Sequence, residues 1–246
     1  MSIKLLAHTQ LSDEFLDSID YDTLMSGAGT ATSGQAVALT AIRTCYSATK
    51  PSEIVAAEGE RYFGQSASDG EGGTEADRLF RHITRSGHLS TLEHVSYTFA
   101  IEGVSRALLA QLTRHRVGFS FSVQSQRYVR MGSGDKSGGF DYVVPPSIRD
   151  KGPGAIAVFK ASMGALQQDY DALRLLGVPA EDARMVLPNA AATNLTMTAN
   201  LRALLDFYGK RRKGRGAQHE ITELAERLRE EVTRVDPWTA PYFDAV

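Results

Sequence analysis

Eighteen consecutive residues, from Gln111 to Tyr128, contain three arginines, one histidine, three serines and three glutamines. Arginine offers a planar fork of donors that matches phosphate oxygens in pairs, while serine and glutamine add neutral hydrogen bonds that orient the rest of a ligand. So many polar groups are costly to bury without a partner. The segment therefore predicts a site for a phosphate-bearing ligand, such as a nucleotide, although a solvated basic patch is the ordinary alternative for an isolated Arg-His-Arg sequence.

The patterns on either side favour a site over a patch. Apolar residues recur at helical spacing over 104–112, so Gln111 and Arg114, three residues apart, lie on one side of a helix end and can meet one ligand. Downstream, apolar residues alternate with serine and glutamine over 119–124, which is typical of a strand with one apolar and one polar side. A solvated patch needs neither pattern.

Other residues capable of chemistry are weaker candidates by themselves. The segment 87–94 follows an expected helix and contains His88 and His94, which are as easily structural histidines as ligand contacts. His82, His88 and His94 are six residues apart, a spacing that suits neither a helical nor a strand metal pair, so we predict no metal site. Arg184 stands beside an apolar run, and a salt bridge at a helix end is its simplest role.

Composition indicates a globular chain. Its 246 residues, 42% of them hydrophobic, suffice for a sizeable core, and we expect a single domain over 1–246. A formal charge of −2 gives no global attraction to nucleic acid, and the basic run 210–215 lacks interleaved aromatic residues, so we expect no nucleic-acid partner. The only cysteine, Cys45, has no nearby base, and we expect a small buried residue. Neither a signal peptide nor a membrane span is evident, which favours a soluble cytoplasmic protein.

The spacing of apolar residues and the positions of glycine and proline predict the elements that position these groups. Strands are expected at 3–6, at 95–101 with Gly103 as its end, and at 119–123. Helices are expected at 37–42, 75–86, 104–112, 156–173, 200–208 and 221–232. Glycine caps the second of these at Gly87, and the apolar stripe of the long helix 156–173 predicts a core or subunit interface. The Gly- and Ser-rich stretches 64–75 and 131–139 are predicted to be mobile loops.

Three blocks stand in order along the chain. They are Gly87-His88-x-Ser90-x-x-Glu93-His94, then Arg114-His115-Arg116 leading to Ser125-Gln126-Arg127-Tyr128, then Ala183-Arg184-x-x-Leu187-Pro188 with Asn200 beyond. Together they resemble the flavin-dependent thymidylate synthases, the ThyX family, whose signature is Arg-His-Arg, seven residues, then serine. The likeness spans roughly residues 40–232, and a chance match to all three blocks in this order is improbable.

This resemblance implies a fold and a reaction. The fold is α/β (mixed α+β), a single domain with a central mixed sheet flanked by helices, assembled as a homotetramer in which several subunits build each active site. The reaction methylates dUMP to dTMP, with methylenetetrahydrofolate as one-carbon donor and FAD, reduced by NADPH, as hydride carrier. It demands no protein nucleophile, which agrees with the setting of Cys45, whereas the flavin-free thymidylate synthases depend on one.

The resemblance also implies residue roles. The FAD contacts would be Ser90, Arg114, His115, Arg116, Gln124, Asn200, Leu201, Arg202 and Asp206. The dUMP contacts would be Gln111, Arg114, Gln124, Ser125, Gln126, Arg127, Arg184 and Arg211. Arg211 would be the catalytic residue, because a cation against the pyrimidine favours ionisation at N3 and so makes uracil C5 nucleophilic. His88 and Arg212 are further candidates.

The signature block departs from the family pattern by one residue. Eight residues, not seven, separate Arg116 from Ser125, and Val117-Gly118 is the place where we expect the extra one. The position two before the serine, usually Glu or Gln in the family, is Val123, and Gln124 is expected to serve in its stead.

The basic connection contains a second extra residue. Counting forward from Asn200 reaches Arg211 as the activating arginine, but counting back from Ala217-Gln218-x-Glu220-Ile221 reaches Arg212. A histidine common at this corner of the family is Gly216 here.

Two readings compete with the synthase. A nucleotide-binding protein without catalysis could use the same arginines for another phosphate ligand, and a flavin-dependent relative could act on a different pyrimidine nucleotide. Bound flavin separates the first from an enzyme, whereas hydrogen bonds in the pocket decide the base.

Overall fold

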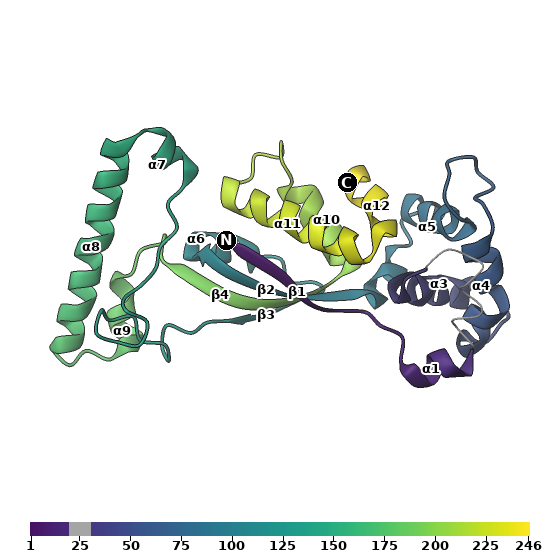
Figure 1. Ribbon diagram of the computed structural model, residues 1–246, viewed down its shortest axis with the longest axis horizontal. Helices are drawn as coiled ribbons and strands as arrows, with labels where there is room; N and C mark the ends of the chain where they lie inside the picture. Colours follow the sequence, from purple (N-terminus) through teal and green to yellow (C-terminus); the bar gives the residue numbers. More distant parts are fainter. Residues whose placement is uncertain (20–30) are drawn as a thin grey trace.

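An antiparallel sheet lies at the centre of the computed structural model, which describes residues 1–19 and 31–246 (Figure 1). Its strands are β1 Ser2–His8, β2 Ser96–Ser105, β3 Phe119–Val123 and β4 Ala192–Asn200, in the order β1-β2-β4-β3. The predicted combination of a central sheet with flanking helices is confirmed. The mixed sheet implied by the family resemblance is wrong in one respect, since all pairings between the described strands are antiparallel. β2 and β3 do run in the same direction, but β4 lies between them, so they never pair.

Helices surround the sheet in separate groups (Figure 1). One face is covered by α10 Leu201–Arg211, α11 His219–Val235 and α12 Ala240–Ala245. One end carries α1 Asp13–Ser18, α3 Ser33–Tyr46, α4 Ile54–Gly64 and α5 Glu75–Arg85. The opposite end is an arm of α7 Pro146–Asp150, α8 Pro153–Leu175 and α9 Ala180–Ala183, while α6 Arg106–Leu112 follows β2 directly. Short 3-10 helices are η1 Pro51–Glu53, η2 Leu89–His94, η3 Arg184–Val186 and η4 Pro237–Thr239. None of the helices described is long and apolar enough to cross a bilayer.

Alternation along the strands separates two faces of the sheet. Side chains buried against the helices include Tyr97, Phe99, Ile101, Leu195, Met197 and Ala199. The other face carries small hydroxyl residues, and Thr98 and Thr198 hydrogen-bond across the β2–β4 pair at 2.9 Å. This polar face needs no apolar cover, as expected for an antiparallel sheet with one solvated side.

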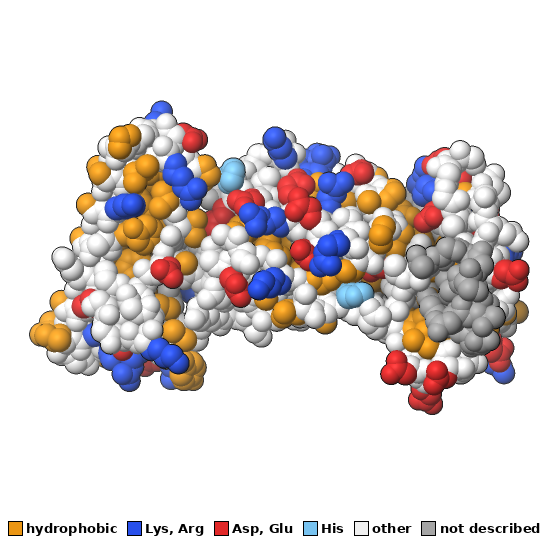
Figure 2. All heavy atoms as spheres, viewed as in Figure 1, with side chains coloured by type: hydrophobic (Ala, Val, Ile, Leu, Met, Phe, Trp, Pro, Cys, Tyr) orange, Lys and Arg blue, Asp and Glu red, His pale blue; other side chains and the backbone are white. Residues whose placement is uncertain are grey.

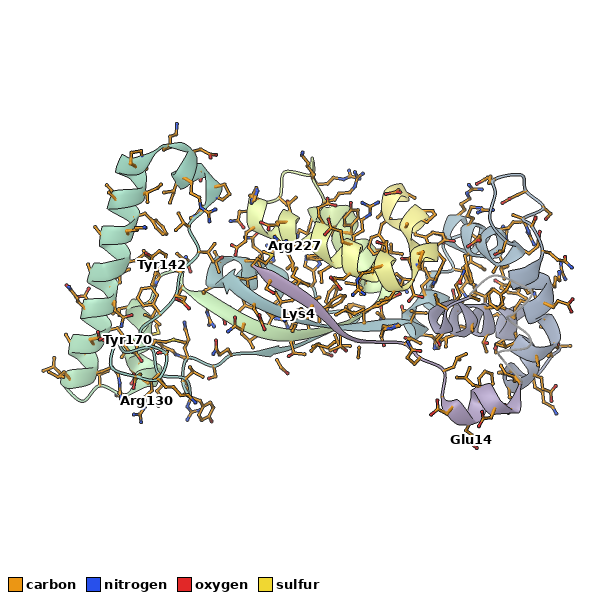
Figure 3. The ribbon with its side chains drawn as sticks, viewed as in Figure 1. Lys4, Glu14, Arg130, Tyr142, Tyr170 and Arg227 are labelled. Atoms are coloured by element: carbon orange, nitrogen blue, oxygen red, sulfur yellow. The ribbon has the colours of Figure 1, made fainter. Side chains whose placement is uncertain are left out.

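A second, smaller apolar cluster holds the arm together. Buried Met163 and Tyr170 of α8 pack with Met131 and Phe140, and the Tyr170 hydroxyl accepts the Met131 N–H at 3.2 Å (Figure 3). The rest of the predicted α8 stripe is only half-buried, and Figure 2 shows hydrophobic side chains gathered on the surface over this helix. The expectation that the stripe is partly core is therefore confirmed.

Most predicted elements are present, with shifted bounds. The helices expected at 37–42, 75–86, 156–173, 200–208 and 221–232 coincide with α3, α5, α8, α10 and α11. Gly87, with φ of 77°, follows α5 as expected for a C-terminal cap. The helix expected from residue 104 begins only at Arg106, because Val104 and Ser105 still pair with β4. β4, α1 and α4 are absent from the sequence-based prediction.

Gly103 does not end β2, contrary to the prediction. The strand continues to Ser105, and its register shifts between Ile101 and Val104, where Gly103 adopts φ of 66°. The Gly103 N–H donates to the Asn194 side chain at 2.9 Å. A β-bulge of this kind bends the strand without terminating it, which redirects the chain into α6.

Both predicted glycine-rich loops are loops, and each is held at its flanks. The first lies between the end of α4 at Gly64 and buried Glu75, which already belongs to α5. Arg81 contacts Asp69 across this loop at 2.9 Å. The second is anchored to α8, where Gln167 donates to the Met131 carbonyl at 2.9 Å.

A buried carboxylate joins the C-terminal segment to the sheet. Asp236 is fully buried and accepts hydrogen bonds from the Tyr97 hydroxyl at 2.7 Å, the Trp238 indole at 2.9 Å and the Thr32 hydroxyl. Burial, reinforced by this carboxylate, raises the pKa of Tyr97, so the phenol stays a donor. Gly34 on α3 is required here, because a Cβ on it would lie 2.7 Å from both Asp236 oxygens.

We expect Asp236→Ala to lower the free energy of unfolding by about 3–5 kcal/mol, because it leaves buried donors without an acceptor. Tyr97→Phe removes one donor only and should cost about 1–2 kcal/mol. Urea unfolding followed by circular dichroism at one fixed protein concentration measures both. An Asp236→Ala cost no larger than that of Tyr97→Phe would show that the other two donors find new partners.

Candidate functional site

A cavity of about 420 Å³ lies where α5, η2 and α10 meet, and it collects several predicted cofactor contacts. Asn200, Arg202 and Asp206 line it from the end of β4 and from α10, and Glu93 lines it from η2. Arg202 and Glu93 form an ion pair at 2.6 Å that links the two elements. The apolar wall includes Leu89, Leu92, Leu205 and Val246. A cavity within about 300–1,000 Å³, apolar with a few fixed polar groups, has the character of a small-molecule or cofactor site.

The turn after Arg116 forms part of the same cavity. Asn200 caps α10 by accepting the Ala203 N–H at 2.9 Å, and its own N–H donates to the Gly118 carbonyl at 3.1 Å. Gly118 has φ of 75°, and a Cβ on it would lie 2.7 Å from both Asn200 and Ala203. Val117, the residue before Gly118, is 89% exposed and lines the cavity. Val117-Gly118, where the extra residue is predicted, lies in a turn, and β3 beyond it pairs regularly with β4.

Two predicted site residues from distant segments meet beside this turn. Arg211 ends α10, and its Nε–H donates to His115 Nε2 at 3.2 Å. The His115 ring lies edge-on to Phe207, with centroids 4.9 Å apart. Burial first, and then the charge of Arg211, lowers the pKa of His115, so the ring is neutral near pH 7.

The structure distinguishes Arg211 from Arg212. α10 runs without interruption from Leu201 to Arg211, so the residue reached by counting forward from Asn200 is the last residue of the helix. Arg212 already has a non-helical backbone, and its Nε is buried without a hydrogen-bond partner among the described residues. Of the two, Arg211 hydrogen-bonds to His115 of the Arg-His-Arg block, and its role as the activating arginine stays a prediction.

The start of α11 holds α6 in place. Buried Glu220 accepts both the Ser105 N–H at 2.7 Å and the Ser105 hydroxyl at 2.5 Å, and Ser105 caps α6. At the other end of α6, Gln111 donates to the Gln218 side chain at 3.3 Å. Gln111 is therefore fixed to the same element that follows the basic connection.

Arg106 is a candidate that the sequence analysis misses. It begins α6, and its pKa is lowered by burial and by the neighbouring charge of Arg184. Arg184 donates to the Glu181 carbonyl at 2.9 Å, and neither arginine forms an ion pair within the described part of the chain. Two half-buried arginines that influence each other's charge and have no carboxylate partner are suited to an anion such as phosphate. No local motif marks Arg106, since only the fold brings it beside Arg184.

The Ser-Gln-Arg block lies at this same end. The Ser125 hydroxyl accepts the Arg127 N–H at 3.2 Å, and Arg127 pairs with Glu181 at 2.6 Å. Gln126 is 6% exposed, and its Nε2 has no partner in the described chain. Gln124 is held by the Asn194 side chain at 3.2 Å. An unpaired buried amide beside arginines is consistent with a group reserved for a ligand.

The two halves of the signature are separated along one strand. Arg114, His115 and Arg116 precede β3, and Ser125 follows it. The five residues of β3 place roughly 17 Å of strand between them. One chain therefore has a cavity end, beside the Arg-His-Arg block, and a two-arginine end, at Arg106 and Arg184. It does not bring all predicted contacts to one ligand.

Several predicted residues have other surroundings. Leu201 is fully buried in the core, so its side chain cannot contact a cofactor. Ser90, Arg114 and Arg116 are exposed. His88 is hydrogen-bonded through Nδ1 to the Tyr46 hydroxyl at 2.9 Å. The prediction that Cys45 is buried is wrong, because it lies on the outward side of α3 near the helix end. The described residues contain no group of three or more His, Cys, Asp or Glu that could hold a metal.

Comparison with known proteins identifies the family. Residues 29–238 match the family described as Thymidylate synthase complementing protein. A flavin-dependent thymidylate synthase from Geobacter sulfurreducens is 48% identical over 155 residues, which cover 63% of this chain and 64% of that protein. One from Halobacterium salinarum is 41% identical over 186 residues, covering 68% of this chain and 74% of that protein.

The chain belongs to the flavin-dependent thymidylate synthase family. Its fold agrees with this assignment. A UMP/dUMP methylase, PolB, from Streptomyces cacaoi has a TM-score of 0.69 at 21% identity, covering 99% of this chain and 94% of that one. The Helicobacter pylori flavin-dependent thymidylate synthase, complexed with FAD and dUMP, has a TM-score of 0.66 at 21% identity, covering 100% and 99%.

The turn between Arg116 and β3 depends on Gly118, which has a positive φ and lies close to Asn200 and Ala203. Gly118→Ala should destabilise the protein by about 1–3 kcal/mol, through the positive φ and the overlap with Asn200. Thermal unfolding measures this, with Gly134→Ala as control, because a Cβ at Gly134 meets nothing within 4 Å and no positive φ is recorded there. Equal melting temperatures for the two variants would mean that the turn relaxes freely.

Proposed function

We propose that this protein is a flavin-dependent thymidylate synthase, which methylates dUMP to dTMP in the cytoplasm. Methylenetetrahydrofolate supplies the carbon, and FAD reduced by NADPH supplies the hydride. The observation that carries the proposal is the hydrogen bond between Arg211 and His115 of the Arg-His-Arg block, which is followed directly by Val117 of the cavity lining. Family membership supports the same reaction.

The cavity bounded by η2 and α10 fits a flavin. Asn200, Arg202 and Asp206 offer donors and acceptors along one side, and leucines provide the apolar wall against which a ring system packs. When bound, the flavin carries the hydride to the one-carbon unit. The protein residues contribute binding and orientation, and the exposed Ser90, Arg114 and Arg116 remain available to a cofactor that extends beyond the cavity.

The Arg106–Arg184 pair fits the phosphate of dUMP. A phosphate between two guanidinium groups relieves their mutual repulsion and accepts charge-assisted hydrogen bonds from both. Ser125, Gln126 and Arg127 supply the neighbouring contacts, although Arg127 must exchange Glu181 for the ligand. We assign the catalytic role to Arg211, whose positive charge stabilises the anionic uracil from which C5 attacks.

We infer that each active site is completed by other copies of the chain, as in a homotetramer. The supporting observation is the separation of the two signature halves by the length of β3. A half-exposed apolar surface on α8 is available to a partner, with Val158 70% and Leu175 93% exposed. An interface there would bring a second cavity end toward the two-arginine end.

The deciding experiment is the visible absorption spectrum of the purified protein, followed anaerobically as NADPH is added with and without dUMP. We expect a flavin spectrum, faster bleaching with dUMP, and dTMP when methylenetetrahydrofolate is supplied. UMP in place of dUMP tests the sugar preference, because the two nucleotides differ only at the 2′ position. A protein that takes up no FAD would refute the synthase, and methylation of UMP alone would reassign the substrate.

Arg106→Gln and Arg184→Gln should each weaken dUMP affinity by about 10–100-fold, because each removes a charge-assisted contact with phosphate. Both should keep FAD, since they lie at the other end of β3. Titration of dUMP against the flavin spectrum measures this. Arg234→Gln is the control, because Arg234 is an exposed arginine on α11 that pairs with Glu231. Unchanged affinity in Arg106→Gln would remove it from the phosphate site.

A further inference from the structure

His115 and Arg211 make a contact that the proposed residue roles leave unexplained. They are 96 residues apart in sequence and joined by one hydrogen bond of 3.2 Å between ring and guanidinium. The family resemblance assigns His115 to the cofactor and Arg211 to the nucleotide. The structure instead directs the imidazole Nε2 at the arginine.

The chemistry of the two groups fixes the direction of this bond. A guanidinium can only donate, so His115 Nε2 must accept and the ring proton must lie on Nδ1. Protonation would place two cations in contact. Burial is the first cause that lowers the pKa of His115. The positive charges of Arg211, Lys210 and Arg114 lower it further, whereas Asp206 raises it.

The imidazole is a rigid acceptor. Phe207, itself 1% exposed, meets the ring edge-on at a centroid distance of 4.9 Å, and Phe119 lies 6.1 Å away on another side. Arg211 has no such restraint of its own, because it ends α10 and forms no ion pair with any residue the structure describes. The hydrogen bond to His115 is thus the side-chain contact that holds the guanidinium.

We propose that His115 is the positioning residue of the activating arginine, holding Arg211 by Nε so that both terminal nitrogens face the pyrimidine. This inference rests on the proposed function. A neutral acceptor suits the task better than a carboxylate. An aspartate or glutamate here would compensate the arginine charge, whereas imidazole orients the guanidinium and leaves its charge for the uracil anion.

Two substitutions of His115 distinguish the role of its acceptor nitrogen from the role of its aromatic ring. His115→Phe keeps the aromatic contact with Phe207 and removes the acceptor, whereas His115→Gln restores an acceptor near the position of Nε2. We expect His115→Phe to lower kcat by about 10-fold or more, with FAD content, melting temperature and the KM for dUMP changed much less. His115→Gln should recover most of kcat. Loss of FAD in His115→Phe would return His115 to the cofactor and overturn the proposal.

A double-mutant cycle provides the second criterion. If His115 acts through Arg211, adding His115→Phe to Arg211→Ala should lower the residual rate no further. If the double variant instead loses rate by the product of the two single effects, the two residues act independently, and this result would also overturn the proposal. Assays of the wild-type protein distinguish a failure of the proposed function from a failure of the role proposed for His115. Failure of wild type to bind FAD or form dTMP sinks the proposed function, whereas active wild type with an equally active His115→Phe variant sinks only the role of His115.

Discussion

The pairing of β4 with both β2 and β3 is the interaction on which the candidate site depends. At one end of β4, Asn200 caps α10 and thereby sets the direction of the helix that carries Arg202, Asp206 and Arg211. Just before its other end, the Ala191 carbonyl accepts the Arg106 N–H at 3.0 Å and so fixes the start of α6. A one-residue slip of β4 would turn its buried residues toward solvent, so hydrophobic burial holds both ends of the site in register.

Charge pairing differs between the site and the rest of the surface. Away from the site, arginines meet carboxylates, as Arg43 does with Glu58 and Arg85 with Glu71. At the site, Arg202 and Arg127 also have carboxylate partners, but Arg106, Arg184 and Arg211 form no ion pair within the described part of the chain, and Arg211 instead contacts a neutral ring. Surface ion pairs contribute little to stability, so leaving them out costs the fold little. What the arrangement preserves is positive charge for an anionic ligand.

Local patterns predict local structure well in this chain, and they fail where the decisive contact is distant. Alternation from Phe119 to Val123 gives β3 correctly. β4 has the same alternation, with Leu195, Met197 and Ala199 on one side and threonines on the other. The sequence-based prediction nevertheless contains only the helix that begins at Asn200. Gly103 looks like a strand end because a bulge and a turn use the same glycine. Arg106 and the His115–Arg211 bond arise from long-range packing, for which a single sequence has no signal.

The two places where the sequence predicts an extra residue relative to the family pattern both lie in turns. A turn can accept such a residue without changing a strand or helix. Gly118 takes a left-handed conformation after Arg116, and Gly214 and Gly216 do so after α10. Glycine adopts these angles without steric penalty, so the chain gains length where direction is already changing. Spacing within β3 and α10 is untouched, and it is this spacing, measured along rigid elements, that places Arg211 against His115.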